Sequence, residues 1–166
     1  PDISSTGNLS TRVLYTGWFF DGNTGIVAGQ SLTSSNGRIS KTTDGGNTWN
    51  YIQYSGTGGT VRSLFFLNAN TGYMTGSGTA RFSKTTDQGQ TWIPNVNIPV
   101  NSYTNMYAID ENNIFAVTSL NKIIKTSDAG ATWTTQTLLG NSATLTDIIF
   151  KDANTGYISG NGNYFA

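Results

Sequence analysis

The sequence predicts an all-β protein built from short antiparallel strands. Three observations support this fold class: a composition that disfavours helices, and two motifs that each recur about every forty residues. The chain has 166 residues, which is enough for one domain with a core of its own. Its 20 glycines, with no Leu-, Ala- or Glu/Lys-rich run, favour strands joined by tight turns over helices.

The first motif ends in a tryptophan and is named here the Asp motif. Its copies are "TTDGGNTW" (42–49), "TTDQGQTW" (85–92) and "TSDAGATW" (126–133). The tryptophans are therefore 43 and 41 residues apart. A nearly constant spacing of this size is typical of repeat proteins, so we expect one structural unit for each copy.

The second motif alternates with the first along the chain. Its copies are "FFDGNTGIVAG" (19–29), "FLNANTGYMTG" (66–76), "AIDENNIFAVT" (108–118) and "IFKDANTGYISG" (149–160). One polar residue opens the turn in each copy, and we call these four the turn anchors: Asp21, Asn68, Asp110 and Asp152. They are 47, 42 and 42 residues apart, and the longer first interval indicates an insertion at 31–37.

Each unit is predicted to contain four strands. In the second unit, a β-rich run at 60–68 is followed by a turn, a strand at 73–78, an alternating strand at 80–86, the turn "DQGQ" and a strand at 91–96. Four antiparallel strands with a period near forty residues form one blade of a β-propeller. The chain then contains about three and a half blades in one segment, 1–166: near 12–54, 60–98 and 102–139, with a partial blade at 144–166.

The Asp motif is predicted to be structural. Its aspartate accepts hydrogen bonds from backbone amides of its own turn, and its glycine permits a tight backbone reversal. Its threonine begins the fourth strand, and its tryptophan packs against a neighbouring strand or blade. The residues concerned are Asp44, Gly46, Thr48, Trp49, Asp87, Gly89, Thr91, Trp92, Asp128, Gly130, Thr132 and Trp133.

These motifs resemble a known repeat. The three copies are similar to the bacterial neuraminidase repeat, or Asp box, and with the "NANTGYMTG"-like segments the chain looks most like propellers related to photosystem II assembly factors and their secreted bacterial relatives. Sialidases, xyloglucan-degrading glycosidases and sortilin-type receptors also carry Asp boxes. The resemblance covers nearly the whole chain. It implies a propeller in which the boxes lie at the periphery, away from any active site.

Composition excludes several function classes. Nine basic and nine acidic residues cancel, so we expect no nucleic-acid partner. No apolar run is long enough to span a bilayer, so we expect no membrane insertion. Cys and His are absent, which excludes thiolate or imidazole catalysis and Cys/His metal sites, and we expect neither a metal nor a cofactor. A polar, low-charge composition suggests an exported bacterial protein, extracellular or on the cell surface.

No catalytic residue is predicted, and whether the protein is an enzyme stays open, with non-enzyme favoured. Outside the repeated positions, the acids are Asp2, Glu111 and Asp147. Glycoside hydrolysis needs two carboxyls about 5–10 Å apart, and Glu111 with Asp147 is the pair to test. A sialidase needs an arginine cluster, but no arrangement of the four arginines is diagnostic: Arg12, Arg38, Arg62 and Arg81.

Binding residues are predicted on the first strand of each blade, because that strand lines the central channel of a propeller. The four equivalent positions, five residues before each turn anchor, are Thr16, Ser63, Asn105 and Asp147. They are small or polar and differ between blades, which suits a channel rim that contacts a ligand. The alternative is a water-filled lining. Tyr51 and Tyr54 suggest either a platform for stacking sugars or packing of the outer strand.

The sequence therefore favours a non-catalytic module that binds a protein or a glycan, or serves as a scaffold. The alternatives are a fragment of a sialidase- or xyloglucanase-like glycoside hydrolase, and a structural or adhesive repeat that assembles through blade edges. Closed propellers typically have four to eight blades. We therefore expect self-association or completion by further blades, rather than closure of a small ring by the N-terminal segment 1–11.

Overall fold

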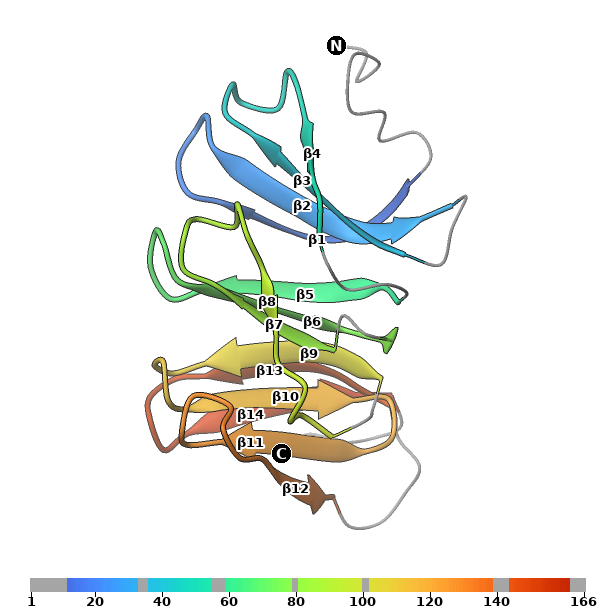
Figure 1. Ribbon diagram of the computed structural model, residues 1–166. Helices are drawn as coiled ribbons and strands as arrows, with labels where there is room; N and C mark the ends of the chain where they lie inside the picture. The colour runs from blue at the N-terminus through green and yellow to red at the C-terminus, as the bar shows by residue number, and fades with distance from the viewer. Residues whose placement is uncertain are drawn as a thin grey trace.

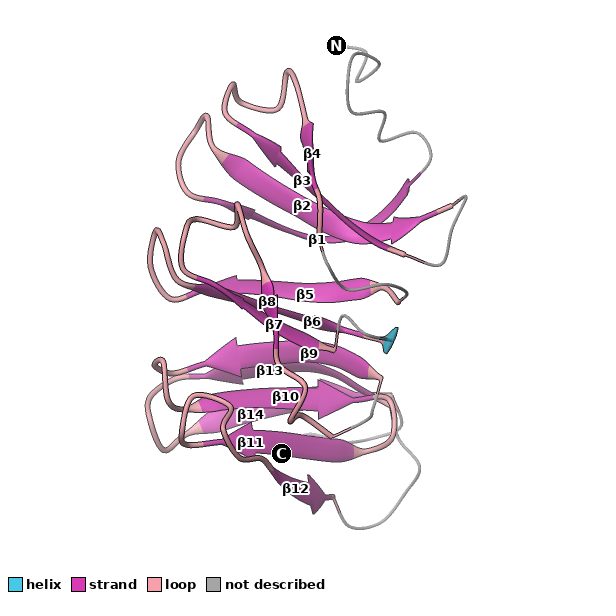
Figure 2. Ribbon diagram, in the orientation of Figure 1, coloured by secondary structure: helices cyan, strands magenta, loops and turns pink. Residues whose placement is uncertain are grey.

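The computed structural model describes residues 12–32, 36–54, 59–78, 81–99, 102–138 and 144–161. Within these ranges the chain forms four antiparallel sheets, in each of which neighbouring strands follow one another in chain order. Figure 2 shows strands joined by loops, with a short helical turn at Gly78. The described residues include no helix with the length and apolar character needed to cross a lipid bilayer. The predicted all-β class is confirmed.

We call the sheets blades 1 to 4, and the first three lie one below another in Figure 1. The strands of blade 1 are β1 (Arg12–Phe19), β2 (Gly25–Ser31), β3 (Gly37–Thr42) and β4 (Asn50–Ile52). Those of blade 2 are β5 (Val61–Phe66), β6 (Gly72–Gly76), β7 (Phe82–Thr85) and β8 (Ile93–Pro94). Those of blade 3 are β9 (Tyr103–Ala108), β10 (Ile114–Thr118), β11 (Lys122–Thr126) and β12 (Thr134–Thr137). Blade 4 contributes β13 (Leu145–Phe150) and β14 (Gly156–Gly160).

The turn anchors close the hairpin between the first and second strands of every blade. In blade 1, Oδ1 of Asp21 accepts hydrogen bonds from the amides of Asn23 and Thr24, both at 2.7 Å. Asn68 accepts the same two bonds in blade 2, so the turn needs a side-chain oxygen rather than a charge. The equivalent bonds form at Asp110 and Asp152.

The first strand of every blade contains a β-bulge at one equivalent position. The register shifts between Leu14 and Thr16 in β1, between Val61 and Ser63 in β5, and between Leu145 and Asp147 in β13. In blade 3, Val117 pairs with Asn105 and the next residue pairs with Tyr103. The residues left out of the pairing, named here the bulge residues, are Tyr15, Arg62, Thr104 and Thr146.

The hydrophobic core lies between the blades. Buried residues of blade 1, such as Ile26 and Ile39, form one cluster with Phe66, Met74 and Trp92 of blade 2. A second cluster joins blades 2 and 3, and a third joins blades 3 and 4. Each blade is thus stabilised mainly by burying its faces against its neighbours.

One residue pair recurs at the same position in every blade. The pairs are Trp18 with Ile26, Phe65 with Tyr73, Tyr107 with Phe115, and Ile149 with Tyr157. Across the boundaries, the ring centroids of Trp18 and Phe65 are 5.8 Å apart, and those of Phe65 and Tyr107 are 4.9 Å apart. The aromatic side chains therefore connect consecutive blades.

One detail differs from the sequence prediction. The fourth strands begin at Asn50, Ile93 and Thr134, after the tryptophan, so the threonine of the Asp motif does not begin the strand. The threonine still belongs to the turn, because its amide and hydroxyl donate to the aspartate. The N-terminal segment 1–11 and residues 33–35 of the predicted insertion lie outside the described residues.

Candidate functional site

The Asp motif forms the same hydrogen-bonded turn in all three copies. In the first copy, Oδ1 of Asp44 accepts hydrogen bonds from the Thr42 hydroxyl at 2.8 Å and from the Thr48 amide at 2.9 Å. Its Oδ2 accepts the Thr48 hydroxyl at 2.6 Å. The Gly46 amide donates to the Thr42 hydroxyl, and the indole N–H of Trp49 donates to the Gly46 carbonyl at 3.1 Å. Both carboxylate oxygens are thus occupied within the turn.

The first threonine of the motif is a residue that the sequence interpretation missed. Its hydroxyl both donates to the aspartate and accepts the glycine amide, at Thr42, Thr85 and Thr126 alike. The signal was present, because threonine occupies this position in all three copies.

These bonds lower the pKa of the motif carboxyls. The Thr48 hydroxyl and amide lower the pKa of Asp44 to about 2, and Thr132 does the same for Asp128. For Asp87, partial burial opposes the change, but the hydrogen bonds from Thr91 and Thr85 outweigh it and the pKa is lowered. A carboxyl that stays ionised at neutral pH and is bonded on both oxygens is poorly suited to act as a general acid.

The four predicted rim residues lie side by side on the first strands and bond from blade to blade. The Ser63 hydroxyl donates to Oδ1 of Asn105 at 2.6 Å, and the Asn105 amide donates to Oδ1 of Asp147. Thr16 accepts the backbone amide of Leu64 at 3.2 Å. We call these four residues the inner row. Its polar atoms largely serve the contacts between blades, so whether they also contact a ligand stays a prediction.

A pocket of about 370 Å³ opens beside the inner row and is lined by all four bulge residues. The remaining lining residues are Ser102, Tyr103 and Ser119 of blade 3. A bulge turns its extra side chain away from the regular alternation of the strand. Because the bulge is at the same place in each first strand, it brings four side chains from four blades to one pocket. The sequence interpretation selected the residue directly after each of them.

The pocket contains one cation and several hydroxyl groups. The guanidinium carbon of Arg62 lies 4.1 Å from the centroid of the Tyr15 ring. The Thr104 hydroxyl donates to the Leu145 carbonyl at 2.6 Å, and the Thr146 hydroxyl lies 3.1 Å from that of Ser159. In the described ranges the one ion pair joins Lys84 to Glu111, at 3.0 Å, and Arg62 has no carboxylate partner.

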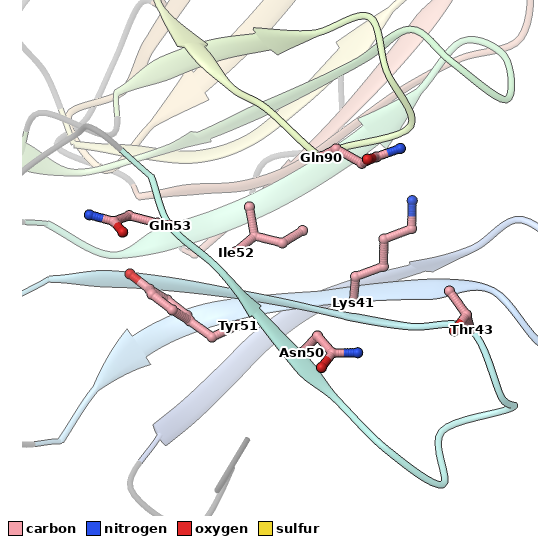
Figure 3. Close-up of a pocket in the computed structure, with 7 residues that line it drawn as sticks. All are labelled: Lys41, Thr43, Asn50, Tyr51, Ile52, Gln53 and Gln90. Carbon is pink, nitrogen blue, oxygen red and sulfur yellow. The ribbon is translucent and has the colours of Figure 1, made fainter. Parts of the chain in front are cut away.

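A second pocket, of about 420 Å³, lies between the outer strand of blade 1 and the Asp motif of blade 2 (Figure 3). The Lys41 side chain extends toward Gln90 across this space. Its ammonium donates to the carbonyl and to the side-chain oxygen of Gln88, at 3.0 and 3.1 Å, and burial lowers its pKa. The cation of this pocket is therefore already engaged in joining two blades.

Tyr51 and Tyr54 do not form one stacking platform. Tyr51 lines the second pocket and is 42% exposed, with the Arg38 guanidinium 4.7 Å from its ring centroid. Tyr54 is buried, and its hydroxyl lies 3.3 Å from that of Ser83 in blade 2. Tyr54 therefore packs between blades, as the alternative interpretation of the sequence proposed.

The carboxyls considered for glycoside hydrolysis have separate surroundings. Glu111 lies in the turn after β9 and pairs with Lys84 of blade 2. Asp147 bonds to Asn105, and about 10 Å of strand separates Asn105 from the end of β9. The described residues include no group of three or more acidic side chains that could hold a metal ion.

No protein-family model matches this chain, and no curated protein does. Solved structures do match. A structure of YCF48 bound to D1 peptide has a TM-score of 0.60 and 19% identity over 92% of this chain and 63% of its own. YCF48 from Cyanidioschyzon merolae has a TM-score of 0.62 and 15% identity, over 89% of this chain and 48% of its own. The GH74 enzyme of Niastella koreensis has a TM-score of 0.64 and 20% identity, over 89% of this chain and 26% of its own.

These neighbours are β-propellers. The chain has a β-propeller fold. It spans less than two thirds of the length of each of these neighbours. At 15–20% identity the similarity shows the fold alone, and the propeller predicted from the repeats is confirmed.

Proposed function

We propose that this chain is a non-catalytic binding module that recognises a protein ligand through the pocket at its four bulges. The observation that carries the proposal is the coincidence of position: four blades place four side chains, of the three types Tyr, Arg and Thr, around one pocket. Repeated residues maintain the blades, whereas the side chains that differ between blades are free to specify a ligand. The similarity to YCF48, one structure of which holds a D1 peptide, supports a peptide as the ligand.

Two finer assignments belong to the same proposal. The hydrogen bonding of the Asp motif supports its assignment to the Asp-box repeat, with the threonine–aspartate bonds as its structural basis. The polar, low-charge composition supports an exported bacterial protein that acts outside the cell.

The proposal is tested by applying fluorescently labelled protein to arrays of peptides and of oligosaccharides. We expect saturable binding to a subset of peptides, and a fall of at least tenfold in affinity for Tyr15→Ala. Tyr51→Ala is the matched control, because both tyrosines are 42% exposed and each lies beside an arginine guanidinium. Equal losses in the two variants, or binding to oligosaccharides alone, would contradict the proposal.

The runner-up function is that of a piece of a glycoside hydrolase. The similarity to two GH74 enzymes, at a TM-score of 0.64 for each, favours it. This chain spans 26% and 21% of their lengths, so the catalytic groups would have to come largely from blades outside this segment. Release of the aryl group from a panel of aryl glycosides, abolished by Asp147→Asn, would favour the enzyme.

We also propose self-association, or completion by further blades, through the two open faces of the blade stack. Ile149 and Tyr157 occupy the boundary position of blade 4 and are 56% and 54% exposed. On blade 1, Phe19 is 53% exposed, whereas its equivalent in blade 2, Phe66, is 3% exposed. Within the described residues no blade covers either face. Each face carries the equivalents of side chains that are buried or half-buried at the occupied boundaries.

A further inference from the structure

We propose that the pocket at the four bulges binds a carboxylate group of a peptide, with Arg62 as its anchor. This inference rests on the proposed function and specifies the chemistry of its ligand. It is argued from the placement of Arg62, its surroundings and the other groups that line the pocket.

Arg62 is an exposed residue between two buried residues of strand β5. Its neighbours Val61 and Ser63 are buried, while Arg62 itself is exposed. As a bulge residue it has no partner in the β5–β6 register. The backbone is thus anchored by its buried neighbours, and the guanidinium lies at the pocket rather than in the hydrophobic core between the blades.

The Tyr15 ring orients the guanidinium. At 4.1 Å from the ring centroid, the guanidinium is in the range of a close cation–π contact. Such a contact uses a face of the guanidinium and leaves its N–H edges available. Those edges form the fork that binds a carboxylate through two parallel hydrogen bonds.

The guanidinium of Arg62, like that of Arg38, lacks the polar partners that Arg12 and Arg81 have among the described residues. Arg12 donates to the Ser40 hydroxyl, and Arg81 donates to the Gly78 carbonyl at 2.8 Å. Among the described residues, Arg62 makes neither a hydrogen bond nor an ion pair. Within the described ranges, none of its five N–H donors is bonded to a protein acceptor.

The remaining lining favours a small anion with one charge. Hydroxyl donors come from Ser102 and Ser119, whose loops are joined by a backbone hydrogen bond of 3.1 Å, and from Thr146. The one cation in the pocket matches one carboxylate. A phosphate carries nearly two charges, which the single cation of the pocket does not match. A sugar would have to compete with Arg62 for the Tyr15 ring.

The experiment is an NMR titration that follows the Nε–Hε signal of Arg62 in the isotopically labelled full chain. The probes are N-acetyl-triglycine, its C-terminal amide, N-acetyl-Gly-Asp-Gly-amide, sodium acetate and inorganic phosphate. We expect saturable shifts with N-acetyl-triglycine and N-acetyl-Gly-Asp-Gly-amide, the two peptides that carry a carboxylate and are called the acids here. The amide of N-acetyl-triglycine should bind at least tenfold more weakly, and acetate should bind more weakly than either acid. In Arg62→Gln and Arg62→Lys, which lack that signal, the titration follows the backbone amides of Ser102 and Ser119 in the pocket. Arg62→Gln should lose at least tenfold in affinity for the acids, and Arg62→Lys should lose less.

Arg38→Gln is the control, because Arg38 also lies over a tyrosine ring, that of Tyr51, but outside this pocket. Its affinity for the acids should be unchanged. Equal binding of acid and amide, preference for phosphate, or an equal loss in Arg38→Gln would overturn the carboxylate site. If array peptides bind but acid and amide do not differ, the proposed function stands and this inference fails. If acetate binds at Arg62 as tightly as the peptides do, and no array peptide binds, the peptide function fails.

Discussion

At the scale of single residues, the Asp motif depends on a left-handed backbone. The two residues after the aspartate have positive φ in each copy: 70° and 88° at Gly45 and Gly46, 58° and 76° at Gln88 and Gly89, and 57° and 90° at Ala129 and Gly130. A residue with a Cβ costs about 1–2 kcal/mol more than glycine in this conformation. Gln88 and Ala129 are therefore strained positions that the surrounding hydrogen bonds maintain.

We predict opposite effects for two substitutions in this turn. Ala129→Gly should stabilise the protein by about 0.5–1 kcal/mol, because relief of the left-handed strain exceeds the added entropy of the unfolded chain. Gly89→Ala should destabilise it by about 2 kcal/mol or more, because a Cβ there also lies 2.3 Å from Cδ1 of Ile26. Urea unfolding midpoints measure both. A stabilising Gly89→Ala would contradict the described turn.

The motif carboxyls also predict how stability depends on pH. The folded-state pKa of Asp44 and of Asp128 is about 2, against an ordinary value of 3.8. A lowered folded-state pKa contributes stability above pH 4 that is lost as pH falls toward 2. We expect the urea midpoint to be level from pH 7 to 5 and to fall between pH 4 and 2.

The double variant Asp44→Asn/Asp128→Asn serves as the control for this dependence. It should be less stable than the parent at pH 7 but lose less on acidification, because these two groups no longer titrate. If both proteins lost the same stability between pH 4 and 2, the motif carboxyls would not be the source of the acid sensitivity.

At the scale of strands, the inner row couples neighbouring blades. Asn105 accepts from the Ser63 hydroxyl and the Met106 amide and donates to Asp147. We predict that Asn105→Ala costs about 1–3 kcal/mol, since each hydrogen bond contributes about 0.5–1.5 kcal/mol. In a double-mutant cycle, Ser63→Ala and Asn105→Ala should couple by about 0.5–1.5 kcal/mol. Strict additivity of the two losses would show that the bond does not stabilise the fold.

The strands also show what the sequence could and could not predict. Turn anchors such as Asn68 and tryptophans such as Trp92 recur in register, so their turns follow from the repeat itself. The bulges do not, because the same extra residue occurs in the first strand of every blade and therefore leaves the spacing of the repeats unchanged. The bulge is visible only in the structure, where Ser63 and Leu64 are adjacent yet both buried, which breaks the alternation of an ordinary strand.

At the scale of the whole molecule, the blades are joined by repeated boundaries. We predict that the chain of 166 residues associates in solution through its open faces, because Ile149, Tyr157 and Phe19 leave apolar surface uncovered. Light scattering should give a mass above that of one chain, 17.8 kDa. Tyr157→Lys should lower that mass, and Ile93→Lys, at a 70% exposed position away from both faces, should not. A well-dispersed monomer would refute the prediction.

The bulge described in each first strand has a consequence for how such a protein changes over time. A bulge residue has no partner in the strand register, so replacing its side chain leaves the hydrogen-bond ladder intact. Tyr15, Arg62 and Thr146 can then vary one at a time at little cost in stability, whereas a change at Thr104 also removes its bond to the Leu145 carbonyl of blade 4. Copies of the same blade can acquire new ligand preferences by drift at these positions, and an engineer could alter the pocket in the same way.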